Sequence, residues 1–403
     1  MILVTGMGVL APNGCGLERF WEATLAGRGG IAPLTRFDTG RGAGRPAGQV
    51  AGFDAAEHLP SRLLPQTDVS TRMALVAAQW ALDDAKVNTA ALTDYDMGVV
   101  TGNASGGFEF THREFDKLWS RGSEHVSVYE SFAWFYAVNT GQISIRHGMR
   151  GPSSALVAEQ AGGLDAVGHA RRTVRRGTPL VVTGGVDSAL DPWGWAAHIA
   201  SGSVSTATDP ARAHLPFDTA AAGYVPGEGG AMLVLEDAAA ARVRGVPRVH
   251  GEIAGYASTF DPAPGSERPP GLRRAIDLAL ADAGVGAADI DLVLADAAAL
   301  PDLDRAEVEA LAAVFGVRGV PVTTTKPLTG RLFSGAGPLD IVTALLAARD
   351  GVIPPTAGVT DLADDRIDLV LGAPRPADVG AALVLARGRW GFNSAVVVRA
   401  VTD

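Results

Sequence analysis

Short apolar runs alternate with alanine-rich stretches along the chain. The apolar runs contain many β-branched residues and lie at residues 97–101, 180–183, 231–235, 292–295 and 382–385. Continuous apolar runs of this length are typical of strands that are covered on both faces. The alanine-rich stretches between them predict helices. Together they predict a layered α/β fold with largely buried strands.

A self-comparison indicates that part of this pattern occurs twice. The helical segment ALDDAKV at 81–87 recurs as ALADAGV at 279–285, and each copy is followed by an acidic turn and an apolar strand. A second pair, AGGLD at 161–165 and AGPLD at 336–340, opens two further predicted helices. The small residues at both of these helix starts would let the two helices approach closely.

The helices of the second pair are expected to end at glycines, Gly177 and Gly351. Gly245 and Pro247 interrupt the pattern between the two copies. We therefore predict two α/β halves, at residues 1–245 and 246–403.

Composition and charge narrow the functional classes. A hydrophobic content of 47% and 50 glycines predict a folded core with many turns. The net charge of −10 disfavours nucleic acid or an anionic membrane as the partner. An acidic partner would need a local basic patch. One candidate is the set Arg171, Arg172, Arg175 and Arg176, although this set fits a solvated helix face better.

Cysteine use and hydropathy predict a cytoplasmic protein. The one cysteine, Cys15, excludes an internal disulfide and fits a reducing compartment. There is no apolar stretch of 18 residues and no signal-peptide pattern at the start. We therefore expect neither membrane insertion nor secretion.

Four motifs occur in order along the chain. They are VTGMG at 4–8 with Pro12 and Gly14, PFD at 216–218 with GYVPGEG at 223–229, Lys326 with TG at 329–330, and GFNSA at 391–395. Together they resemble the β-ketoacyl synthase branch of the thiolase fold over essentially the whole chain. The resemblance implies a thiolase fold, with duplicated α/β halves in a layered αβαβα arrangement. It also identifies Glu228 and Lys326 as retained motif residues.

The first motif also fits a dinucleotide-binding fingerprint at residues 6–11. That motif requires a helix to begin at once, whereas Pro12 and Gly14 follow here. We therefore expect no nucleotide cofactor, and no metal.

The resemblance places three catalytic positions, and none of them holds the residue that the chemistry needs. A condensing enzyme uses a cysteine thiolate at a helix N-terminus and two histidines. The matching positions are Gln160, Asp296 and Arg331. A carboxamide cannot form the acyl intermediate, and all eight histidines lie at or before His250. We therefore expect no independent condensing activity, and we do not expect Cys15, in the first loop, to replace the nucleophile.

The stretch VAEQAGG at 157–163 is similar to that of the cysteine-less subunit of bacterial type II aromatic polyketide synthases, the chain-length factor. The similarity extends to the actinorhodin-type octaketide factors. It implies a heterodimer with a catalytic ketosynthase alpha subunit, and an acyl carrier protein that carries malonyl and polyketide chains. Two competing hypotheses are a stand-alone ketosynthase and a purely structural thiolase-fold scaffold.

Three roles remain open for Gln160 at this stage. It could be a structural filler that hydrogen-bonds at the helix start, or a mimic of the neutral acylated cysteine. It could also assist the decarboxylation of malonyl-carrier protein for priming, since its amide could donate to an enolate oxygen.

Aromatic residues are concentrated at residues 108–136, which hold nine of the 25 in the chain. A core layer would explain this density as well as an interface would, although the admixed charged residues favour an interface. The resemblance implies that the region lies at the subunit interface and lines the tunnel that holds the growing chain. The implied chain-length gate consists of Phe108, Thr111, Phe115, Trp193 and Gly194.

Spacings of three, four and seven place Phe108, Thr111 and Phe115 on one helix face, as both a tunnel lining and a core stripe would require. Phenylalanines at two gate positions are similar to those of octaketide factors. We therefore predict a product of sixteen carbons, which spans about 20 Å when extended.

Overall fold

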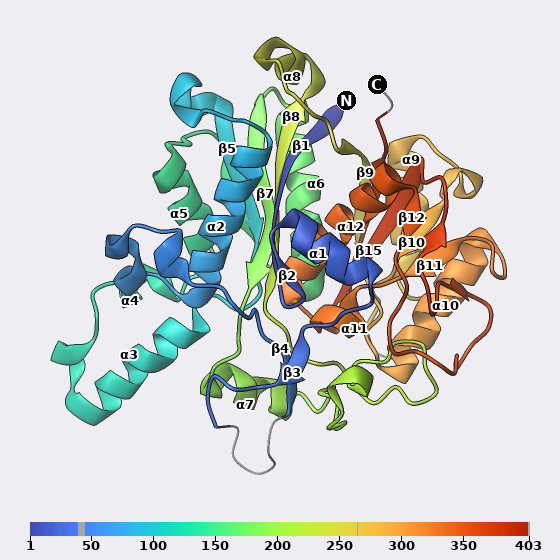
Figure 1. Cartoon of the computed structure of the whole chain (residues 1–403), viewed down its shortest axis with the longest axis horizontal. Helices are drawn as coiled ribbons and strands as arrows, with labels where there is room; N and C mark the ends of the chain where they lie inside the picture. The colour runs from blue at the N-terminus through green and yellow to red at the C-terminus, as the bar shows by residue number, and fades with distance from the viewer. Residues whose placement is uncertain (39–44, 264, 402–403) are drawn as a thin grey trace.

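A 12-stranded mixed sheet runs through the computed structural model, which describes residues 1–38, 45–263 and 265–401 (Figure 1). In the first half its strands are β1 (Ile2–Ala11), β2 (Gly14–Cys15), β5 (Met97–Gly102), β6 (Ser153–Leu156), β7 (Leu180–Asp187) and β8 (Gly229–Asp237). In the second half they are β9 (Gly251–Phe260), β10 (Leu292–Leu294), β11 (Pro321–Thr323), β13 (Asp368–Leu369), β15 (Ala381–Gly388) and β16 (Phe392–Arg399). All five apolar runs predicted as strands lie in this sheet.

The order of the strands is the same in the two halves. The first half reads β1-β8-β7-β5-β6 and the second reads β9-β16-β15-β10-β11. The directions also agree, because the first two pairings of each series are antiparallel and the last two are parallel. The halves join where β1 pairs with β9, at Leu3 with Glu252 and Val4 with Gly251. The duplication inferred from short sequence repeats therefore extends to the topology.

Helices cover both outer faces of the sheet and fill the space between its halves (Figure 1). The helices are α1 (Leu17–Leu25), α2 (Val69–Asp84), α3 (Phe108–Arg121), α4 (Glu130–Ala133), α5 (Val138–His147), α6 (Gly162–Arg175), α7 (Pro192–Ala200), α8 (Ala238–Arg244), α9 (Leu272–Ala283), α10 (Pro301–Phe315), α11 (Lys326–Thr329) and α12 (Ala336–Asp350). α2 packs on the first-half strands and α9 on the second-half strands, while α6 and α12 pack against each other in the middle. This is the predicted αβαβα layering.

The two central helices meet through small residues. A Cβ atom added to Gly163 would lie 2.0 Å from the carbonyl oxygen of Ser334, and one added to Gly337 would lie 2.6 Å from Cγ of Leu164. Both distances are far below van der Waals contact, so larger residues would force the helices apart. The prediction that small residues allow close approach is confirmed. α12 also ends at Gly351, as predicted.

Smaller elements complete the fold. Two short sheets pair β3 (Ile31–Pro33) with β4 (Pro46–Gly48), and β12 (Val352–Ile353) with β14 (Arg375–Pro376). Among the described residues, no helix is long and apolar enough to cross a membrane.

The aromatic segment at 108–136 is not an ordinary core layer. It leaves the body of the molecule between β5 and β6, and α3 projects at the lower left of Figure 1. Trp119 is 76% exposed and both Trp134 and Phe135 are 48% exposed. Phe110, in contrast, is fully buried. Four of the segment's nine aromatic side chains, Trp119, Trp134, Phe135 and Tyr136, are thus exposed in the isolated chain.

The candidate basic patch on α6 requires a correction. Arg171 is buried, where its guanidinium pairs with Asp282 at 2.6 Å and donates to the carbonyl oxygens of Ile253 and Ala254. Arg175 lies 3.7 Å from the same carboxylate. Arg171 therefore joins α6 to the second half of the molecule, and it is not available to an external partner.

Candidate functional site

Gln160 lies in a tight turn between β6 and α6. The turn is a 3-10 helix, Glu159–Ala161, and Glu159 adopts a left-handed backbone conformation with φ of 50°. Such a conformation is costly for a non-glycine residue and is common in turns that present a nucleophile at the start of a helix. The turn here presents a carboxamide instead, and the side chain of Gln160 is completely buried.

The structure brings the three substituted catalytic positions together. Nε2 of Gln160 donates to Oδ1 of Asp296 at 2.9 Å. Nη1 of Arg331 lies 3.6 Å from Oδ2 of the same carboxylate. Asp296 follows β10 and Arg331 follows α11, so three distant segments converge on one point.

Asp296 and Arg331 are ionised, and their charges neutralise each other. Burial opposes the charge on Asp296, but Arg331 and Lys326 outweigh it and hold the pKa of the carboxyl below its usual value. Burial likewise opposes the charge on Arg331, and the carboxylates of Glu159 and Asp296 more than compensate, so its pKa is raised. The centre therefore contains a fixed ion pair where condensing chemistry needs a thiolate and two imidazoles.

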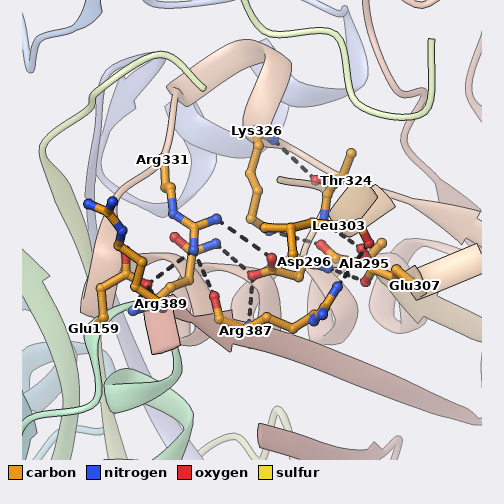
Figure 2. A network of polar contacts seen from close by, with 12 residues as sticks. Glu159, Ala295, Asp296, Leu303, Glu307, Thr324, Lys326, Arg331, Arg387 and Arg389 are labelled. Carbon is orange, nitrogen blue, oxygen red and sulfur yellow. Dashed lines mark hydrogen bonds and ion pairs between the residues drawn. The ribbon is translucent and has the colours of Figure 1, made fainter. Parts of the chain in front are cut away.

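A second carboxylate extends the network toward the surface (Figure 2). Nη2 of Arg331 donates to Oε2 of Glu159 at 3.2 Å and to the carbonyl oxygen of Arg387 at 2.7 Å. The same oxygen of Glu159 accepts from the backbone amides of Gln160 and Arg389, both at 2.9 Å. Glu159 thereby ties the turn before α6 to the segment after β15.

Behind Asp296, a helix supplies two further buried carboxyl groups. Glu307 accepts hydrogen bonds from the amides of Asp296 and Ala297, at 2.7 and 2.9 Å. Burial and the charge of Asp296 raise the pKa of Glu307 to about 7. Burial also raises the pKa of Asp304 to about 7, although the amide of Phe217 donates to it at 2.9 Å. Both residues project from α10 and hold the loop that carries Asp296.

The two retained motif residues are structural anchors. Nζ of Lys326 is buried and donates to Asp340 at 2.7 Å and to the carbonyl oxygen of Ala295 at 2.9 Å. Glu228 is also fully buried, and it accepts from Arg36 and, at 2.6 Å, from the hydroxyl of Ser188. Each charge thus has a charged partner, the buried Asp340 for Lys326 and the partly exposed Arg36 for Glu228, which explains why both residues can persist without catalysis.

Two histidines from the first half approach this region, and no sequence motif indicated them. His214 accepts from the amide of Val225 through Nδ1 at 3.1 Å, and its Nε2 lies 3.3 Å from the carbonyl oxygen of Ala297. Burial lowers its pKa to about 3, so it stays neutral. His198 lies in a cavity wall, and burial lowers its pKa to about 4. Neither forms a hydrogen bond with Gln160.

Three of the five expected gate residues also lie together. The ring of Trp193, on α7, is centred 5.5 Å from that of Phe108 and 5.7 Å from that of Phe115, both on α3. Thr111 is buried on the same helix and Gly194 follows Trp193. Two elements that are far apart in sequence therefore build one aromatic cluster.

A cavity of about 740 Å³ joins the two groups of residues. Phe108, Tyr136 and Gly194 contribute to its wall, and so do Glu159 and Arg331. Gln160 is hidden behind Ala158 and Glu159. The cavity thus reaches the position of the missing nucleophile without exposing the side chain that replaces it.

The three positions matched to catalytic residues hold no thiol and no imidazole. Cys15 lies on β2, and burial raises the pKa of its thiol, which disfavours the reactive thiolate. In the part of the chain that the structure describes, no group of three histidine, cysteine or acidic side chains is arranged to hold a metal ion.

Family models match both halves of the chain. The N-terminal domain model of beta-ketoacyl synthases matches residues 1–241, and the C-terminal domain model matches residues 250–360. The chain is 69% identical to the actinorhodin polyketide beta-ketoacyl synthase 2 of Streptomyces coelicolor, covering 99% of this chain and 98% of that protein. It is 59% identical to the tetracenomycin polyketide synthase ketoacyl synthase beta subunit of Streptomyces glaucescens, with the same coverage.

Solved structures show the same fold. The ishigamide ketosynthase/chain length factor superposes with a TM-score of 0.90 at 26% identity, covering all of this chain and 99% of that one. A beta-ketoacyl synthase from Burkholderia phymatum superposes with a TM-score of 0.91, also at 26% identity, with the same coverage.

Proposed function

We propose that this chain, which belongs to the beta-ketoacyl synthase family, is the non-condensing chain-length factor of a type II polyketide synthase. The observation that carries the proposal is the state of its catalytic centre. Gln160 is buried and hydrogen-bonded to Asp296, which is paired in turn with Arg331. A stand-alone ketosynthase would need a thiolate at this point, and an ionised carboxylate there would oppose its formation.

A folded copy without its own chemistry needs a catalytic partner, and we propose a cysteine-bearing ketosynthase for this role. The ishigamide ketosynthase/chain length factor supports such a pairing in a protein of the same fold. The surface of this chain supports it too, because β6 lies at the edge of the sheet and Val157, immediately after it, is 50% exposed. The outward aromatic side chains at 108–136 lie between β5 and β6. Stable interfaces of this kind bury roughly 2,000–5,000 Å².

The proposed work of the subunit is to bound the space in which the growing chain is held. Phe108, Phe115 and Trp193 form an aromatic cluster, and Phe108 also lines the cavity. Bulky rings at this position would stop elongation early, and we propose a product of sixteen carbons. An acyl carrier protein in the cytoplasm would bring malonyl units and carry the chain.

For Gln160 itself we propose a structural role. One N–H of its amide is engaged by Asp296, and the side chain does not reach the cavity surface. A carboxamide in this position leaves little opportunity to donate to an enolate. A Gln160→Ala variant, paired with its ketosynthase, should prime from malonyl-carrier protein at close to the normal rate. A loss of priming with an intact complex would instead support the decarboxylation role.

Reconstitution tests the proposed function directly. The chain is co-expressed with a cysteine-bearing ketosynthase and purified, and the complex is then supplied with malonyl-carrier protein. We expect a one-to-one complex that makes polyketide, whereas this chain alone makes none. Product from this chain alone, or the absence of any complex with the ketosynthase, would refute the proposal.

A further inference from the structure

One face of α3 carries more than the gate phenylalanines. His112 follows Phe108 by four residues and precedes Phe115 by three, so all three share the stripe that faces α7. Both phenylalanine rings contact Trp193 on α7. An imidazole therefore lies between the two rings on the helix face that forms the gate.

His112 makes a polar contact across this junction. Its Nδ1 lies 2.8 Å from Oδ2 of Asp191, the residue that precedes α7. A carboxylate can only accept, so Nδ1–H of His112 is the donor. The side chain of Asp191 is 3% exposed and that of His112 is 36% exposed. The hydrogen bond is therefore sheltered on its acceptor side, where it is less weakened by water.

Asp191 also determines where α7 begins. Its carboxylate caps the helix by accepting from the amide of Gly194 at 2.8 Å and from that of Trp193 at 3.2 Å. One carboxylate thus holds the backbone of Trp193 and the side chain of His112 together. The ring of Trp193 is 43% exposed, so packing on its own constrains it only in part.

We infer that His112 and Asp191 form a clamp that positions the aromatic gate and thereby helps to set product length. The inference rests on the proposed chain-length function. Neither residue touches the polyketide in this account; both act by holding α3 and α7 at a fixed separation. Loosening the clamp would let the rings part, and longer chains would then be accommodated.

Variants of His112 test the clamp in the reconstituted complex. His112→Ala removes the hydrogen bond and the ring, and His112→Phe removes the hydrogen bond but keeps a ring of similar size. We expect the ratio of longer products to normal-length product to rise about tenfold in both, which corresponds to about 1.4 kcal/mol. His112→Gln retains an N–H donor and should restore most of the normal ratio. Product lengths are measured by mass spectrometry and the one-to-one complex by size-exclusion chromatography.

Two controls separate the clamp from a general disturbance and from the gate itself. His169→Ala removes an imidazole from α6, which packs between the halves of the sheet, and should leave product length unchanged. In a Phe108→Ala, Phe115→Ala background, His112→Ala should add little, because the clamp acts through those rings.

Normal product ratios in both His112→Ala and His112→Phe, with Phe108→Ala giving longer chains, would overturn the clamp alone. Unchanged ratios in Phe108→Ala as well would overturn the gate, and the clamp with it. Longer products from His169→Ala would show that the effect is not specific, and would also overturn the clamp.

Discussion

At the scale of single residues, strained backbone conformations lie close to each of the three positions that the family resemblance matches to catalytic residues. Glu159, Ala297 and Phe333 are non-glycine residues with φ between 50° and 52°, and they lie next to Gln160, next to Asp296 and two residues after Arg331. Conformations of this kind cost roughly 1–3 kcal/mol each and tend to cluster at functional sites. Strained turns therefore lie close to Gln160, Asp296 and Arg331, the residues found at the three matched positions.

Restoring the nucleophile alone should not restore catalysis. In a Gln160→Cys variant, made in a Cys15→Ser background, the new thiol would lie beside the ionised carboxylate of Asp296, which raises the pKa of the thiol. Two imidazoles would still be missing, and members of a catalytic triad act as a unit worth on the order of a millionfold in rate. We expect no condensation product from this variant without a partner, as measured by mass spectrometry. Polyketide formation by the variant alone would contradict this interpretation.

At the scale of elements, α10 and the pair of α6 and α12 explain why the centre keeps its shape. α10 presents Asp304 and Glu307 one turn apart to the loop that carries Asp296. Burial raises the pKa of both carboxyl groups to about 7. α6 and α12, at the middle of the molecule, depend on glycines for their close contact. Changing either the buried carboxyl groups of α10 or the glycines between α6 and α12 should therefore alter the free energy of unfolding.

The α10 carboxyl groups predict a pH dependence of stability. In the unfolded chain an aspartate has a pKa near 4, so between about pH 4 and 7 the folded protein holds protons that the unfolded chain releases. The resulting stabilisation is complete in acid and is lost as the pH rises through about 7. Asp304→Asn removes this contribution. As the pH rises from 5 to 8, the free energy of unfolding of the variant should therefore increase relative to that of the natural protein.

Urea unfolding at several pH values measures the difference. Asp365→Asn, at an exposed position, is the control and should follow the natural protein across the range. If Asp304→Asn also ran parallel to the natural protein, the assigned role of Asp304 would be wrong.

Two glycine substitutions test the packing of the central helices. Gly163→Ala would place a Cβ atom 2.0 Å from the carbonyl oxygen of Ser334. This clash should lower the free energy of unfolding by about 3 kcal/mol or more. Gly141→Ala, within α5, meets no atom within 4 Å and should raise it by about 0.5–1 kcal/mol, because alanine favours helix over glycine. Thermal and urea unfolding of the two variants give the comparison. Similar effects from both would contradict the close-contact argument.

Much of this organisation could be predicted from the sequence, and the part that could not has a physical reason. The buried strands and the small residues at 161–165 and 336–340 leave local signatures, so the duplicated layers were correctly predicted. The resemblance placed Gln160, Asp296 and Arg331 at three catalytic positions, and their convergence followed from it. The contacts of His112 with Asp191 and of Arg171 with Asp282 join residues about 80 and 110 positions apart, and no local pattern reports such pairs.

At the scale of the whole molecule, the isolated chain leaves a sheet edge and several aromatic side chains uncovered. Its sheet ends at an edge strand, β6, and four aromatic side chains of the segment at 108–136 are exposed, with Trp119 76% accessible. Exposed apolar patches of this kind mark protein interaction sites. In the function proposed above, the partner supplies the thiolate and the histidines while this chain supplies one wall of the space that holds the product. The proposed function therefore requires that this wall control product length.

The most direct measurement is the product length of the reconstituted complex when the gate is opened. The complex of the catalytic ketosynthase with a Phe108→Ala, Phe115→Ala variant is supplied with malonyl-carrier protein, and its products are compared with those of the natural pair. We predict a shift from sixteen carbons to longer chains, since removing two rings enlarges the space beside Trp193. Sixteen-carbon products from a folded and active one-to-one complex of the variant would contradict the account.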